Sequence, residues 1–155
     1  MSTFRPDDHS RPTDPAEAQA RAAVVRTLTV LVGAMAGALV VIGVVLAVIG
    51  AEVVTPEVWM LLVAGVATAG AWVLVATVRP AGPPGRSLPT PAAVQATTIF
   101  RVAVLEAPAM MGLALAFVSQ PVNLLIYVLP AMFALTGIWL FARPSHVAEQ
   151  ISRAA

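Results

Sequence analysis

Four long apolar stretches constrain this chain more than any other feature of its sequence. They cover residues 27–50, 58–78, 97–118 and 123–142. Only the third contains charged residues, Arg101 and Glu106. Each stretch is close to the ~20 residues that a helix rising ~1.5 Å per residue needs to cross a bilayer core of ~30 Å. Because a backbone in lipid must satisfy its own hydrogen bonds, runs of this length predict helices.

The composition agrees with a membrane protein. Of the 155 residues, 59% are hydrophobic and 11% are charged, whereas a soluble domain is about 25% charged. A soluble fold of this size leaves much of its surface in water and has no room to hide so many apolar side chains. The net charge of +1 gives no strong attraction to nucleic acid. The absence of cysteine excludes disulfides and thiolate chemistry. We therefore expect the lipid bilayer as partner and no nucleic acid.

The connectors predict how the helices pair. Residues 51–57 and 119–122 are short, and short connections favour antiparallel neighbours. Residues 80–96 contain five prolines and two glycines, which is typical of an extended linker. The predicted fold class is all-α, an integral membrane four-helix bundle of two antiparallel hairpins. The hairpins occupy residues 23–79 and 97–143.

Both ends of the chain are polar. Residues 1–22 mix prolines with alternating charges, which predicts a disordered tail that turns helical near residues 15–21. Residues 144–155 form a short second tail. The first apolar stretch is too long for the core of a signal peptide.

The arginines predict the orientation. All nine basic residues are arginine, and all lie in the tails, in the linker or at the helix ends beside them. The two opposite connectors carry only Glu52 and Glu57 as charged residues. In membrane proteins, the connectors and tails that are rich in basic residues stay on the cytoplasmic side. We therefore expect a multi-pass protein of the bacterial inner (plasma) membrane with both termini cytoplasmic.

Glu106 is the candidate functional residue. It follows Arg101 by five residues and Thr97 by nine, which places it roughly 8–14 Å inside the membrane. A carboxylate at such a depth costs about 2.5–3.5 kcal/mol. It must therefore be paired, hydrogen-bonded or protonated. Three roles stay open: a structural polar contact, a proton or ion site, and a contact with a partner subunit.

Four residues are candidate partners of Glu106. Thr136 and Trp139 lie at its depth in the fourth stretch, and Thr68 lies in the middle of the second. Arg101 is the fourth candidate, but it lies about 140° away around the helix. Its long side chain is expected to reach toward the headgroups instead.

Prolines and small residues mark kinks and close contacts. Pro108 and Pro130 each remove a helical hydrogen bond, freeing the carbonyls of Val104 and Ile126. Small residues let membrane helices approach closely. The candidates are Gly33, Gly37, Gly65, Ala69, Ala103, Ala109 and Gly112. Packing within one molecule is favoured over a dedicated dimer face.

The sequence contains no motif of known catalysis. It has no GxSxG, HExxH, P-loop or paired-carboxylate arrangement, so we expect no enzyme, no metal and no cofactor. The leading hypothesis is an accessory or assembly protein whose partner is a second copy or another membrane protein. The alternative is a small transporter or proton-coupled subunit that uses Glu106.

Residues 101–145 carry motifs that resemble a known group of proteins. The segment runs from Arg101 through Glu106-x-Pro108 and Gly112-Leu113 to Arg143-Pro144-Ser145. It resembles an uncharacterised family of small four-helix membrane proteins of bacteria, of the actinobacterial type. That family has no assigned activity, so the resemblance implies a topology and no function.

Part of this segment is also similar to the ion-carrying helix of rotary ATPase ring subunits. The similarity covers Glu106-Ala107 and Gly112-Leu113-x-x-Ala116. In those subunits the glutamate helix is the second of a hairpin, whereas here it is the first. Ring membership is therefore not expected.

Overall fold

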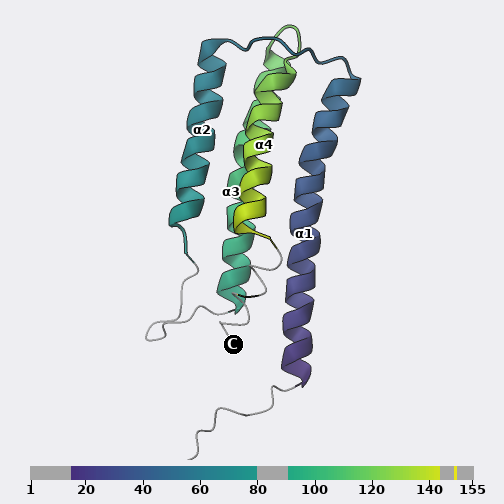
Figure 1. Cartoon of the computed structure of the whole chain (residues 1–155), viewed down its shortest axis with the longest axis vertical. Helices are drawn as coiled ribbons and strands as arrows, with labels where there is room; N and C mark the ends of the chain where they lie inside the picture. The colour runs from purple at the N-terminus through teal and green to yellow at the C-terminus, as the bar shows by residue number, and fades with distance from the viewer. Residues whose placement is uncertain (1–14, 80–90, 144–148, 150–155) are drawn as a thin grey trace, which may run out of the picture.

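The protein folds into four helices. The computed structural model describes residues 15–79, 91–143 and 149. The helices are α1 (Pro15–Val48), α2 (Val58–Thr77), α3 (Pro91–Val118) and α4 (Leu124–Phe141) (Figure 1). All four are long and apolar enough to cross a membrane. The prediction of an all-α protein with four such helices is confirmed.

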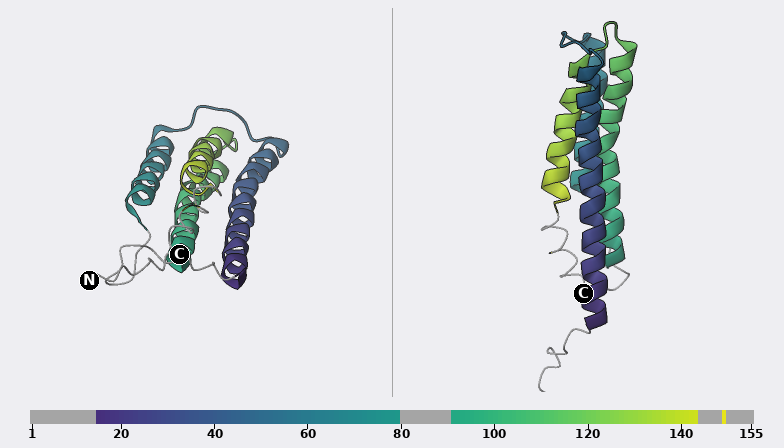
Figure 2. Two further views of the ribbon diagram at one scale, coloured as in Figure 1. Left: turned by 60° about the horizontal axis from the view of Figure 1, so that its bottom comes forward. Right: turned by 90° about the vertical axis from the view of Figure 1, so that its right-hand side faces the viewer.

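The arrangement differs from two hairpins. α3 and α4 pack against each other more extensively than any other pair. α1 and α2 lie on opposite sides of this central pair (Figures 1 and 2). The described residues therefore do not support the predicted packing of the first two helices as a hairpin. Their connector, residues 49–57, reaches up to ~30 Å when extended at ~3.3 Å per residue, so its shortness does not force the two helices together.

That connector is fixed where it crosses the end of α3 and α4. The Glu52 N–H donates to the carbonyl of Val122 at 2.8 Å. The buried Asn123 side chain donates to the Val54 carbonyl at 3.1 Å, and its oxygen accepts from the N–H of Leu125 at 3.0 Å, capping α4. Gly50, with φ of +87°, turns the chain out of α1. These bonds join the two short connectors into one layer, which we call the glutamate end.

Two helices extend further toward the opposite end, which we call the arginine end. α1 has 34 residues and α3 has 28, against 20 for α2 and 18 for α4. α1 begins at Pro15, inside the predicted tail, and α3 begins at Pro91 rather than at residue 97. Leu28 and Val94 form a small apolar cluster between the two extensions. The other predictions for the tails and linker lie outside the described residues.

The backbones of α3 and α4 approach closely at Gly112. A Cβ atom at this position would lie 2.5 Å from the carbonyl oxygen of Ile126 and 3.2 Å from Cγ of Pro130. Ile126 is the residue whose carbonyl Pro130 leaves without its helical donor. The predicted kink and the predicted small residue therefore lie against each other. Gly137 makes a second close approach, because a Cβ there would lie 2.6 Å from Cδ2 of Leu105.

Candidate functional site

Glu106 lies half-buried on α3. It forms no hydrogen bond or ion pair within the described part of the chain. Val104 and Pro108 face α2 across a small pocket of about 290 Å³. Glu106 follows Val104 by two residues, about 200° around the helix. It therefore points away from α2.

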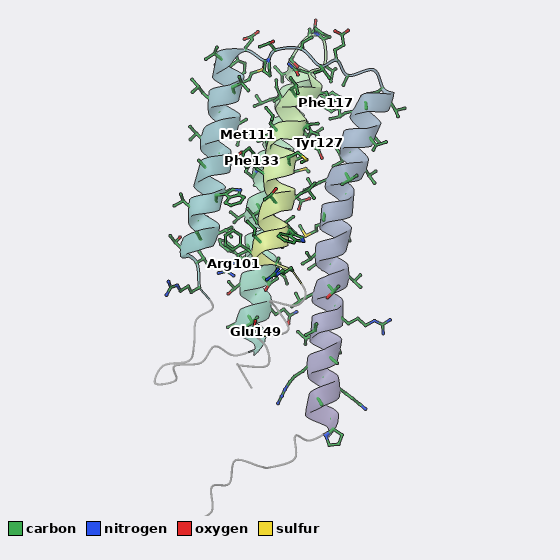
Figure 3. All side chains as sticks on the ribbon, viewed as in Figure 1. Arg101, Met111, Phe117, Tyr127, Phe133 and Glu149 are labelled. Carbon is green, nitrogen blue, oxygen red and sulfur yellow. The ribbon has the colours of Figure 1, made fainter. Side chains whose placement is uncertain are left out.

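Tyr127 is the side chain that shares the surroundings of Glu106. Its phenol lies within electrostatic range of the Glu106 carboxylate. Tyr127 is buried on α4, and its hydroxyl donates to the Leu39 carbonyl of α1 at 2.6 Å. Figure 3 places its ring between the central pair and α1. Glu106 therefore belongs to the junction of α1, α3 and α4.

The predicted partners of Glu106 are engaged elsewhere. The hydroxyl of Thr136 donates to the Met132 carbonyl at 2.8 Å, and that of Thr68 donates to the Ala64 carbonyl at 2.7 Å. Both bonds stay within one helix. Trp139 is 63% exposed, and the Arg143 guanidinium lies 5.7 Å from its ring centroid. No bond joins Glu106 to any of these three side chains in the residues described.

Arg101, the fourth candidate, joins three helices at the arginine end. Its Nη2 donates to the Val78 carbonyl at 2.6 Å. Val78 is the C-cap of α2, and the last carbonyls of a helix lack partners and carry partial negative charge. The guanidinium also lies 6.0 Å from the Phe141 ring of α4, while its Nε is buried without a partner. Arg101 therefore bonds to the end of α2 and not to Glu106.

The small residues divide into two groups. Ala109 and Gly112 are buried on α3. Gly33 and Gly37 on α1, and Gly65 on α2, are exposed, and an added Cβ would meet nothing within 4 Å. Ala69 and Ala103 are also exposed. Packing within one molecule therefore accounts for the first group and not for the second.

α2 and α4 border a pocket on the surface of the described residues. It is an apolar groove of about 360 Å³. Trp72 contacts Phe133 edge-on, with ring centroids 6.5 Å apart, and contacts Phe141 at 5.9 Å. Neither this groove nor the pocket between α2 and α3 includes Glu106 in its lining. The described residues contain no group of three or more His, Cys, Asp or Glu side chains suited to a metal ion.

Comparisons with protein-family models, with curated proteins and with solved structures find no match to this chain. The resemblance of residues 101–145 to the bacterial four-helix family stays a prediction.

Proposed function

We propose that this protein is a non-enzymatic accessory or assembly protein of the bacterial inner membrane, with both termini in the cytoplasm. In this role it binds another membrane protein, or a second copy of itself, through the outer face of α1. The positive-inside rule supports the orientation, because the connectors at the glutamate end carry no arginine.

One observation carries the proposal. Gly33 and Gly37 lie four residues apart on α1, both exposed, with nothing within 4 Å of an added Cβ. Glycines at this spacing allow two membrane helices to approach closely. We call the surface formed by Gly33 and Gly37 the ridge of α1. Since the fold does not use this ridge for its own packing, a helix from another chain is the partner that suits it.

Photo-cross-linking in native membranes tests this interface. A photoreactive residue at Val40, exposed on the same face as Gly33, is expected to cross-link to another protein chain. Gly33→Leu should abolish that product, because the larger side chain separates the helices. Ala38→Leu is the control, since Ala38 is also exposed but lies about 140° around the helix from Gly33. A product that survives Gly33→Leu, or the absence of any product, contradicts the proposal.

A second candidate function rests on Glu106. A half-buried carboxylate without a hydrogen bond or ion pair in the described residues suits a group that takes up a proton or cation inside a membrane. In this candidate the protein is a proton- or ion-coupled transporter subunit, and the junction with Tyr127 and α1 holds the site.

Flux measurements in liposomes separate the two candidates. If Glu106 carries protons or ions, Glu106→Gln abolishes flux, because the amide has no titratable group. Glu57→Gln serves as the control, since Glu57 is exposed at the glutamate end. Flux that is equal in Glu106→Gln and in the unmodified protein ends the transport hypothesis.

A further inference from the structure

The groove between α2 and α4 runs along the membrane-crossing direction. Its lining residues extend along α2 from its first turn to beyond its middle, and come from the middle of α4. They are Leu61, Ala64, Gly65, Thr68, Ala69 and Trp72 of α2, with Leu129, Pro130 and Phe133 of α4. The Thr68 hydroxyl donates a hydrogen bond to the Ala64 carbonyl of its own helix. The groove therefore offers apolar walls and suits a hydrocarbon chain.

Aromatic rings lie at the end of the groove that is nearest the arginine end. Trp72 and Phe133 are the lining residues furthest in that direction on their helices. Their rings meet edge-on at an interplanar angle of 87°, and Phe141 contacts Trp72 beyond them. Figure 3 places Phe133 on the side of α4 that faces α2. A chain lying in the groove therefore enters from the glutamate end.

A carboxylate lies at the end of the groove that is nearest the glutamate end. Glu57 is the N-cap of α2 and is exposed. Leu61, the first lining residue, follows it by four positions, so the two lie on one face of the helix. One oxygen of Glu57 accepts from the Trp59 indole. Glu52, on the other connector at this end, is also acidic, so the charge here favours a cationic group.

The length of the groove fits one leaflet. The α2 lining runs from Leu61 to Trp72, which is 11 positions or roughly 16 Å along a helix. Half of a hydrocarbon core of ~30 Å is ~15 Å. A lipid with its headgroup at Glu57 would therefore bring the end of its acyl chain close to Trp72.

We infer that this groove binds one aminophospholipid of the leaflet at the glutamate end. The ammonium of its headgroup pairs with Glu57, and one acyl chain lies along Leu61 and Gly65 and ends against Trp72. Phosphatidylethanolamine has this chemistry. The inference is independent of the proposed function, because it uses a face of α2 and α4 and not the ridge of α1.

Cross-linking from a photoreactive lipid tests the site. The protein is placed in nanodiscs that contain phosphatidylethanolamine with a diazirine near the end of its acyl chain, and the cross-linked positions are mapped by mass spectrometry. We expect cross-links to concentrate around Trp72 and Phe133. Gly65→Leu should reduce them to the level found on α1, because the larger side chain fills the groove. Ala38→Leu, which also adds a larger side chain at an exposed position on α1, should leave them unchanged.

A competition experiment tests the headgroup. Phosphatidylethanolamine should exclude the probe from the groove better than phosphatidylglycerol. Glu57→Gln should reduce this preference about threefold, within the range for one exposed ion pair. Unfolding measurements should show that the Gly65→Leu and Glu57→Gln variants stay folded.

Three outcomes would overturn the inference. Cross-links spread evenly over all lipid-facing helices would mean that the groove holds no particular lipid. Equal competition by the two lipids would remove the role of Glu57. A protein chain cross-linked to Gly65 or Ala69 in native membranes, with lipid excluded, would assign the groove to a partner helix.

Discussion

Single residues decide how closely the two central helices approach. Pro130 leaves the Ile126 carbonyl without its helical donor, and Gly112 of α3 lies against that carbonyl. The Cα–H of a glycine can make a weak hydrogen bond to such an oxygen. A side chain at position 112 would remove this approach and separate α3 from α4.

Gly112→Ala is therefore expected to destabilise the protein by about 1–3 kcal/mol, the range for adding a methyl group to a packed site. The free energy of unfolding in detergent, or the midpoint of thermal unfolding, measures it. Gly65→Ala is the matched control, because an added Cβ at Gly65 meets nothing within 4 Å. Equal stability of the two variants would mean that α3 and α4 lie further apart than described.

Arg101→Gln should lower the free energy of unfolding by about 1.5–3 kcal/mol, the range for a hydrogen bond to a charged group. The amide is shorter and uncharged, so the Val78 carbonyl loses its donor. A disulfide between cysteines placed at the arginine ends of α2 and α3 should also form less readily. Arg143→Gln is the control, since Arg143 is exposed beside Trp139. An effect as large in Arg143→Gln would show that charge alone matters at this end.

At the scale of the helices, α1 is attached to the central pair along one seam. Leu39 and Leu46 are buried there, while most of the opposite face of α1 is exposed. The hydrogen bond from Tyr127 to Leu39 is buried. α1 is therefore the helix that can separate from the bundle with the least loss of packing.

Tyr127→Phe should weaken the attachment of α1 while keeping the ring in place. The cost expected for one such bond in a membrane is about 0.6 kcal/mol, with ~1.7 kcal/mol as an upper value. Disulfide formation between cysteines on α1 and α4 should be slower in this variant, and that between cysteines on α3 and α4 should not change. Equal slowing of both pairs would point to general unfolding instead.

The four helices could be predicted from the sequence, because each apolar run is long enough to cross a bilayer. Connectors that contain charged residues or proline separate one run from the next. How α1 and α2 pack against the other helices could not be predicted. A helix in lipid is apolar on every side, so hydrophobic periodicity does not mark the face that packs. The central pair depends instead on Gly112, and the crossing connector depends on hydrogen bonds of Asn123.

The candidate site was predictable only in part. Glu106 stood out because it is a carboxylate inside an apolar run. Its depth alone did not predict which neighbouring helix its side chain faces. Thr136, Thr68 and Trp139 were chosen by depth, and the first two bond to carbonyls of their own helices. The only tyrosine of the chain, a polar group in the fourth apolar stretch, was the available signal for Tyr127.

For the whole molecule, the uneven distribution of charge is the feature on which the proposed orientation rests. The connectors of the glutamate end carry Glu52 and Glu57, whereas the arginines of the described residues lie toward the other end; these are Arg21, Arg26, Arg79, Arg101 and Arg143. If all four helices cross the membrane, both termini fall on one side. The proposed orientation places that side in the cytoplasm, following the positive-inside rule.

Labelling of single cysteines in intact cells tests this topology most directly, because the chain has no cysteine of its own. Val53→Cys, at an exposed position of the glutamate end, should react with a membrane-impermeant maleimide from outside. Ser2→Cys and Ser87→Cys should react only after the membrane is permeabilised. Labelling of position 2 or 87 in intact cells, with position 53 protected, would contradict the orientation, and labelling of all three from outside would contradict a four-span membrane protein.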